Sequence, residues 1–121
     1  MTGDELEDRL IRFAVRVGRL VEALPSGRLS NHVAGQLIRS ATSVPANYAE
    51  GCVAESRADF IHKLSIALKE LRESRVWLRI IAEADLVPPP RLRNLRQESD
   101  EIGAILAQSL ITARRRSAQK P

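Results

Sequence analysis

Asp59 and His62 are the residues whose types and spacing come closest to metal chemistry. A carboxylate and an imidazole three residues apart lie on one face of a helix, and such pairs hold the metals of di-iron helical bundles. A centre of that kind needs a second pair, but the other histidine, His32, has Leu29 three residues before it. The sequence therefore predicts no metal site and no cofactor.

Nucleophilic catalysis is also a poor fit to this sequence. The only cysteine, Cys52, follows Gly51 at a predicted helix end, and the negative end of the helix dipole does not activate a thiol. No glycine-rich loop is present to hold the phosphates of a nucleotide. A lone cysteine cannot form an intramolecular disulfide and is typical of the reducing cytoplasm. We therefore predict a cytoplasmic protein that is not an enzyme.

The clearest chemical signal is a surplus of positive charge toward the carboxyl terminus. The net charge of +4 comes entirely from residues 91–121, which hold seven basic and three acidic side chains, whereas residues 1–90 hold twelve of each. Clustered guanidinium and ammonium groups are the usual partners of nucleic-acid phosphates. The candidate nucleic-acid-binding residues are Arg91, Arg93, Arg96, Arg114, Arg115, Arg116 and Lys120.

Two interpretations of the Arg114–Arg116 run stay open. Arginines at the carboxyl end of a helix bond its last carbonyl groups and offset its negative dipole, and in that case they only keep this end soluble. Arginines that reach solvent can instead contact phosphates.

Trp77, between Val76 and Leu78, continues an apolar line that favours a buried or subunit contact over base stacking. Nucleic acid would therefore be contacted mainly at phosphates, with little sequence preference.

Apolar residues recur at alternating spacings of three and four, which predicts amphipathic helices. The predicted helices cover approximately residues 4–24, 31–51, 57–85 and 91–116, followed by a mobile tail at 117–121. Short connections predict an all-α fold, with residues 1–121 forming one domain, an up-down-up-down left-handed antiparallel four-helix bundle. No apolar run approaches the ~20 residues needed to cross a bilayer, so no membrane contact is expected.

Residues at the predicted helix ends carry recognisable signals. Ser30 or Asn31 is expected to cap the second helix by accepting a hydrogen bond from a free backbone amide. Pro45 lies inside that helix and lacks an N–H donor, so a kink or a short break is expected just before it. Gly51 offers a left-handed stop, and Ser56 should cap the third helix.

The remaining polar residues are interpreted mainly as structural. Asn47 and Glu50 could bond backbone groups that Pro45 leaves unpaired, or reach the start of the third helix. The alternative is a polar patch at a subunit interface or pore. Glu70 and Glu73 lie at helical spacing from the basic residues Lys69, Arg72 and Arg75. This spacing predicts local ion pairs on a solvated face, each contributing about 0.5 kcal/mol or less to stability.

The central third of the chain resembles the four helix bundle proteins first recognised as products of intervening sequences in bacterial large-subunit ribosomal RNA genes. The matching segments are SVPANYAEG at 43–51, ESRADFIHKLSIALKELRES at 55–74 and VWL at 76–78. The family pattern is matched at Ser43, Pro45, Asn47, Glu50, Gly51, Ser56, Phe60 and Glu73, among other positions. These motif residues are interpreted as structural.

The resemblance implies a bundle that assembles as a ring-like homopentamer. It also implies a relationship to the accessory protein that works beside reverse transcriptase in diversity-generating retroelements, and such relatives are associated with RNA or DNA binding through basic surface. We therefore predict a non-enzymatic homo-oligomer that binds RNA or DNA through its basic carboxyl-terminal helix and tail. The alternative is a protein–protein scaffold or adaptor that binds no nucleic acid.

Overall fold

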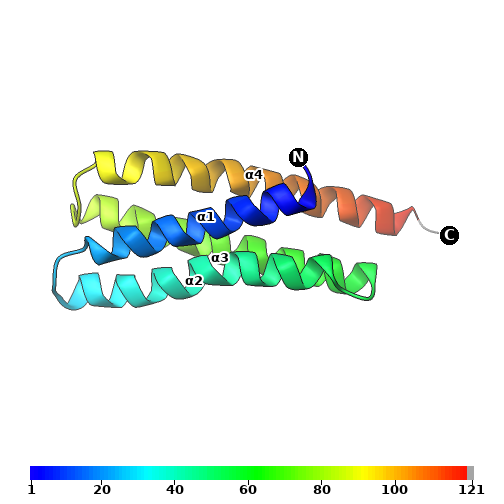
Figure 1. Cartoon of the computed structure of the whole chain (residues 1–121), viewed down its shortest axis with the longest axis horizontal. Coiled ribbons are helices and arrows are strands. Elements are labelled where there is room, and N and C mark those ends of the chain that lie inside the picture. Colours follow the sequence, from blue (N-terminus) through cyan, green and yellow to red (C-terminus); the bar gives the residue numbers. More distant parts are fainter. Residues whose placement is uncertain (120–121) are drawn as a thin grey trace.

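The computed structural model describes residues 1–119, and α-helices are the only regular elements in that part of the chain. The helices are α1 (Gly3–Glu22), α2 (Arg28–Cys52), α3 (Arg57–Glu83) and α4 (Pro90–Ala118). Short loops reverse the chain between them, so that it runs up, down, up and down along one axis (Figure 1). The predicted all-α four-helix bundle is confirmed.

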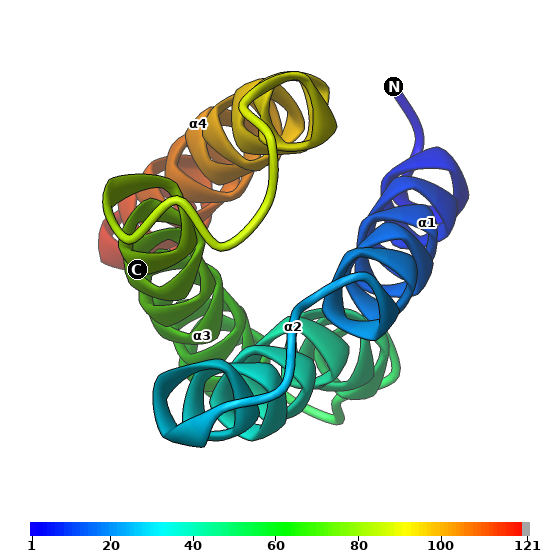
Figure 2. The same ribbon diagram turned by 90° about the vertical axis from the view of Figure 1, so that its left-hand side faces the viewer.

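Each helix packs only against its two neighbours around the bundle, as the view along the axis shows (Figure 2). The contact between α2 and α3 is the most extensive, and the contact between α1 and α4 is the least extensive. Lys120 and Pro121 lie outside the described residues, so the predicted tail is described only as far as Gln119. In that part, α4 continues as a helix to Ala118, two residues beyond the predicted end.

The core is built almost entirely from aliphatic side chains, which interdigitate well between helices. Every helix contributes one face. The larger side chains that are completely or almost completely buried include Leu10, Phe13, Val17, Val33, Leu37, Val44, Leu64, Leu71, Leu78, Ile81, Ile102 and Leu106. The same heptad-like spacing that predicted the helices therefore also selects the core.

The start of α2 differs from the prediction. Neither Ser30 nor Asn31 caps it, because the helix begins at Arg28 and both residues lie within its first turns. Gly27 takes this place with a φ of 147°, a conformation that costs glycine little and other residues much. The Asn31 amide donates to the Gly27 carbonyl over 2.9 Å. A turn that only glycine makes easily thus starts the helix three residues before the predicted position.

Pro45 does not interrupt α2. Of the kink or short break expected before the proline, the break does not occur, because one helix runs from Arg28 to Cys52. Val44 and Tyr48 on either side are buried, so packing holds the helix together where one hydrogen bond is lost.

The prediction that Gly51 ends α2 in a left-handed conformation is wrong. Gly51 lies inside the helix and is buried, and a Cβ placed there would lie 3.1 Å from the Cβ of Lys63 on α3. Gly51 therefore permits close packing of two helices.

Candidate functional site

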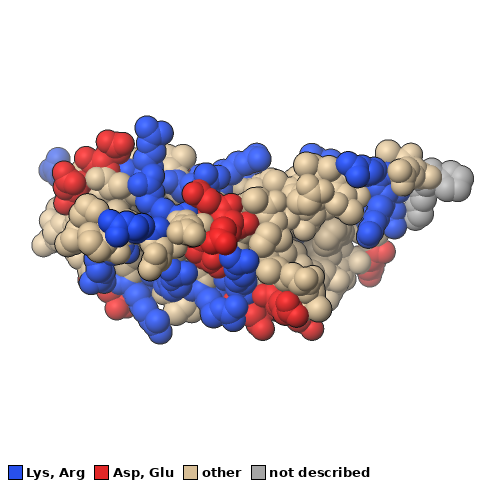
Figure 3. Space-filling view, turned by 90° about the horizontal axis from the view of Figure 1, so that it is seen from above, with Lys and Arg blue, Asp and Glu red and all other residues tan. Residues whose placement is uncertain are grey.

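Basic side chains gather in separate regions of the surface seen from the α4 side. One region lies toward the end of the bundle where α4 begins, and another lies close to the carboxyl end of α4 (Figure 3). Between them is a wide stretch with few charged side chains. The six candidate residues that the structure describes are therefore divided between the two ends of a long helix.

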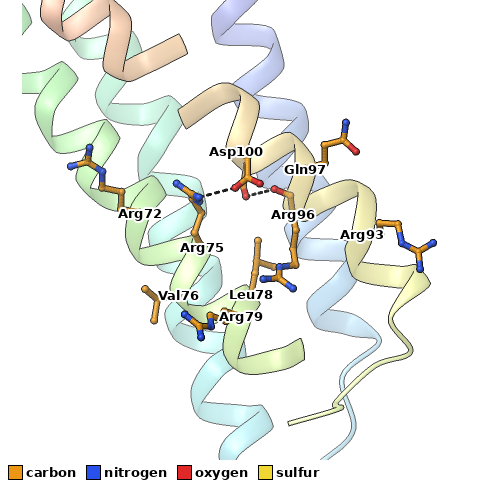
Figure 4. Close-up of a pocket in the computed structure, with 10 residues that line it drawn as sticks. Arg72, Arg75, Val76, Leu78, Arg79, Arg93, Arg96, Gln97 and Asp100 are labelled. Carbon is orange, nitrogen blue, oxygen red and sulfur yellow. Dashed lines mark hydrogen bonds and ion pairs between the residues drawn. The ribbon is translucent and has the colours of Figure 1, made fainter. Parts of the chain in front are cut away.

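A groove of about 670 Å³ between α3 and α4 holds the first group of arginines (Figure 4). Five arginines and one aspartate line it, together with a few neutral residues, and the Arg72 and Arg93 side chains extend outward at its two edges. The charged lining residues are Arg72, Arg75 and Arg79 from α3, and Arg93, Arg96 and Asp100 from α4. Two of the predicted residues, Arg93 and Arg96, thus line the same groove as three arginines that the sequence-based prediction missed.

Two acidic residues of α3 are directed toward α2 and not into the groove. Glu70 and Glu73 both pair with Arg39 of α2, with 3.1 Å between Glu70 and Arg39. The predicted local ion pairs with Lys69, Arg72 and Arg75 are therefore wrong. A hydrogen bond from the Trp77 indole, followed by the contact with Arg39, lowers the pKa of Glu73. These interactions keep Glu70 and Glu73 out of the groove, whereas Glu83, also on α3, lies 3.8 Å from Arg79.

Within the groove, Asp100 is the only carboxylate in the lining. Its Oδ1 lies 2.8 Å from Nη2 of Arg75. Arg72, Arg93 and Arg96 form no ion pair with any residue between 1 and 119. The groove therefore carries a net positive charge that residues 1–119 do not neutralise.

Arg91 lies on the other side of α4, in a hollow of about 300 Å³ shared with α1. Two arginines of α1, Arg16 and Arg19, line the same hollow, and the sequence-based prediction missed them as well. Counting charge by segment concealed all five missed arginines, because residues 1–90 balance overall. These arginines are spaced three and four residues apart, which places them on one face of each helix, and this pattern could have identified them from the sequence.

The Arg114–Arg116 run lies at the opposite end of α4, and all three residues are exposed. Arg93 and Arg115 are 22 residues apart on one helix, which corresponds to about 33 Å along its axis. Lys120 lies outside the described residues. The terminal arginines and the groove therefore form two separate positive regions.

The residues of the matched motif lie mostly at helix contacts and helix ends. The Asn47 side chain donates to the Ser43 carbonyl over 2.8 Å, and Glu50 lies 3.6 Å from Lys63 on α3. Ser56 caps α3, as predicted, by accepting a hydrogen bond from the Asp59 amide over 3.1 Å. Partly buried Phe60 packs against the core, and the Ser43 hydroxyl donates to the Arg39 carbonyl.

Trp77 is partly buried and packs against the core. Its indole donates to Glu73, and its ring meets the His32 ring edge to face, with 5.6 Å between the ring centres.

Asp59 and His62, the residues closest to a metal-binding pair in the sequence, are both exposed. Residues 1–119 contain no group of three potential metal-ligating side chains. None of the four described helices is long and apolar enough to cross a membrane.

Comparisons with known proteins give a family match. The sequence model of the 23S rRNA-intervening sequence protein family matches residues 6–108, a range that includes the groove and ends before Arg114. A crystal structure of a protein of unknown function from the S23 ribosomal protein family of Bacteroides thetaiotaomicron is also similar. The two chains are 34% identical with a TM-score of 0.77, over 87% of this chain and 97% of that chain. No curated protein matches.

Proposed function

Because this chain belongs to the 23S rRNA-intervening sequence protein family, we propose that it is a non-enzymatic, cytoplasmic protein that binds RNA or DNA at phosphate groups. The observation that carries the proposal is the α3–α4 groove, which is lined by five arginines and one aspartate, and in which Arg72, Arg93 and Arg96 form no ion pair with any described residue. Phosphates supply the negative charge that the groove lacks. Arginine suits this task because its planar fork can bond two phosphate oxygens at once.

The lining of the groove favours phosphates over bases as the point of contact. It contains no aromatic side chain on which a base could stack. Its apolar residues, Val76 and Leu78, present only aliphatic surface. Binding should therefore depend weakly on nucleotide sequence and strongly on salt concentration.

Fluorescence anisotropy with labelled RNA and DNA, measured over a series of salt concentrations, tests the proposal. The double variant Arg93→Ala/Arg96→Ala removes two groove charges that form no ion pair among the described residues. We expect about tenfold weaker binding near 0.1 M salt, and a salt dependence that is shallower by about one to two phosphate contacts.

The matched control is Arg12→Ala/Arg57→Ala, which removes the same charge from exposed positions outside the groove. Equal weakening by both variants would mean that net charge alone attracts nucleic acid, and the groove would lose its assignment. Absence of RNA and DNA binding by the wild-type protein at 50 mM salt would refute the function itself.

Self-association is a second candidate function, favoured by large aliphatic side chains at the surface. Ile11 and Val15 are one turn apart on α1, and Ile38, Val76 and Ile111 are exposed on the other helices. A second copy of the chain could cover such residues, as the predicted homopentamer requires. Light scattering in line with gel filtration gives the mass directly, and a monomer at micromolar concentration would exclude this role.

A reverse transcriptase is the protein partner that the family resemblance implies. Pull-downs from the host, treated with nuclease to remove bridging nucleic acid, test for it.

A further inference from the structure

The seam between α1 and α4 is closed at its middle by an ion pair. Arg9 of α1 donates two hydrogen bonds to Glu98 of α4, from Nε over 2.9 Å and from Nη2 over 2.7 Å. Glu101 lies 3.8 Å from the same guanidinium group. The side chains of Arg9 and Glu98 are only 23% and 15% exposed, so this is a largely buried, bidentate contact.

One heptad farther along the same seam, the charges no longer match. Seven residues after Arg9 in α1 is Arg16, and because the helices are antiparallel, it faces the region seven residues before Glu98, which is Arg91. Both residues line the 300 Å³ hollow together with Arg19 and Asn94. A pair of opposite charges is thus followed by a group of like charges.

Like charges gathered in one hollow repel one another, although weakly here, because Arg19 and Arg91 are exposed and Arg16 is only partly buried. No carboxylate lies within 4 Å of Arg16, Arg19 or Arg91 anywhere in the described part of the chain. An anion between these guanidinium groups would replace repulsion with attraction.

The backbone at the start of α4 does not supply this site. Pro90 has no N–H group, and the amides of Arg91 and Leu92 donate to the carbonyls of Pro88 and Pro89. An anion in the hollow must therefore be held by side chains. Asn94 adds a neutral amide donor on the same α4 face as Arg91.

We propose that the hollow lined by Arg16, Arg19 and Arg91 is a second phosphate site, occupied by the nucleic acid strand that lies in the α3–α4 groove. This inference rests on the proposed function. Arg91 lines the hollow and Arg93 lines the groove only two residues away, so the first turns of α4 separate the two sites. The bound strand crosses α4 there, with phosphates on both sides of the helix.

The experiment compares Arg16→Ala/Arg19→Ala with Arg12→Ala/Arg28→Ala, which removes equal charge from exposed residues that line neither site. Anisotropy titrations use a labelled 20-nucleotide single strand at several salt concentrations. We expect Arg16→Ala/Arg19→Ala to bind about tenfold more weakly near 0.1 M salt, with a salt dependence lower by about one contact, and the control to change little. Circular dichroism verifies that each variant is folded. Arg16→Lys/Arg19→Lys keeps the charge, and its affinity should lie between those of the wild type and Arg16→Ala/Arg19→Ala.

A second measurement asks whether free phosphate is the ligand instead. Thermal unfolding is followed in phosphate and in chloride at equal ionic strength. Suppose that phosphate stabilises the wild type but not Arg16→Ala/Arg19→Ala, and that this variant binds the strand as tightly as the wild type does. The hollow would then be a site for free phosphate, and the proposal that the strand crosses α4 would be wrong. Loss of strand affinity in this variant, beyond the loss in the control, supports the crossing strand whether or not free phosphate stabilises the protein.

The two proposals fail in different ways. If groove variants weaken binding while Arg16→Ala/Arg19→Ala matches its control, the second site is wrong and the proposed function stands. If the wild-type protein binds no oligonucleotide, the proposed function is wrong and the crossing strand falls with it.

Discussion

The hydroxyl groups of Ser40 in α2 and Ser74 in α3 lie 2.8 Å apart in the core of the bundle. Both residues are fully buried. Ser40 can also donate to the Leu37 carbonyl over 3.2 Å, and Ser74 to the Glu70 carbonyl over 3.0 Å. Whichever hydroxyl donates to the other, both protons are used. This contact is a satisfied polar bridge across the most extensive helix interface.

Replacing either serine tests the energy of the bridge. Ser40→Ala and Ser74→Ala should each lower the free energy of unfolding by about 1 kcal/mol, because a buried hydrogen bond is lost. The double variant should cost less than the sum, since the second substitution removes a hydroxyl already without its partner. Urea denaturation measures all three, with Ser65→Ala as a less buried control. Simple additivity would show that the two hydroxyls do not interact.

Two glycines in α2 should respond to alanine in opposite directions. Gly51→Ala places a methyl group 3.1 Å from the Lys63 Cβ, so α2 and α3 must separate slightly and stability should fall by about 1–3 kcal/mol. Gly35→Ala meets nothing within 4 Å and should raise stability by about 0.5–1 kcal/mol through helix propensity. Thermal or urea unfolding of both variants measures the difference. Stabilisation of both would contradict the close packing at Gly51.

Stability should fall at alkaline pH because of Tyr48. Burial, followed by interactions with Cys52 and nearby carboxylates, raises the pKa of Tyr48 to about 12, above the usual value of about 10. The folded state then holds the phenol proton more tightly than the unfolded state. This contribution to stability is complete below pH about 10 and is lost as the pH rises toward 12.

Tyr48→Phe provides the control for that titration, because it removes the ionisable group and keeps the ring. Wild type should lose stability faster than the variant between pH 10 and 12. Tyr48 is the only tyrosine, so the ultraviolet absorbance of tyrosinate reports its ionisation directly. An ordinary tyrosine titration near pH 10 in the folded protein would contradict the prediction.

Asp100→Asn should strengthen nucleic-acid binding. The Asp100 carboxylate lies 2.8 Å from Arg75 and is the only negative group in the groove lining. Its removal frees Arg75 for phosphate, so we expect about fivefold tighter binding and a steeper salt dependence. Asp8→Asn makes the same change in net charge at an exposed position on α1. Anisotropy titrations that show equal gains for both variants would assign the effect to net charge.

The terminal arginines should matter only for long ligands. Arg114–Arg116 lie about 33 Å from the groove along α4, a distance that corresponds to roughly ten base pairs of duplex. Substitution of all three by alanine should leave the affinity for a 6-base-pair duplex unchanged and weaken binding of a 20-base-pair duplex. Filter binding or anisotropy with the two lengths measures this. Equal weakening for both lengths would indicate a separate site at the helix end.

The sequence alone predicted an all-α four-helix bundle, because amphipathic helices follow from the spacing of apolar residues within one segment. It failed at the start of α2, where Gly27 and not Ser30 or Asn31 precedes the helix, and at Gly51, which a neighbouring helix approaches closely. It also failed at Glu70 and Glu73, whose partner, Arg39, is more than thirty residues away in the chain.

The candidate site divides in the same way. The sequence by itself determined an all-α fold and the surplus of basic residues near the carboxyl terminus. Only the tertiary structure decided which charges neutralise one another, because pairing depends on the rotation of each helix and on the register between helices. Arg9 meets Glu98, whereas Arg16, one heptad later, shares a hollow with Arg91. Spacing within a single helix contains no information about that partner.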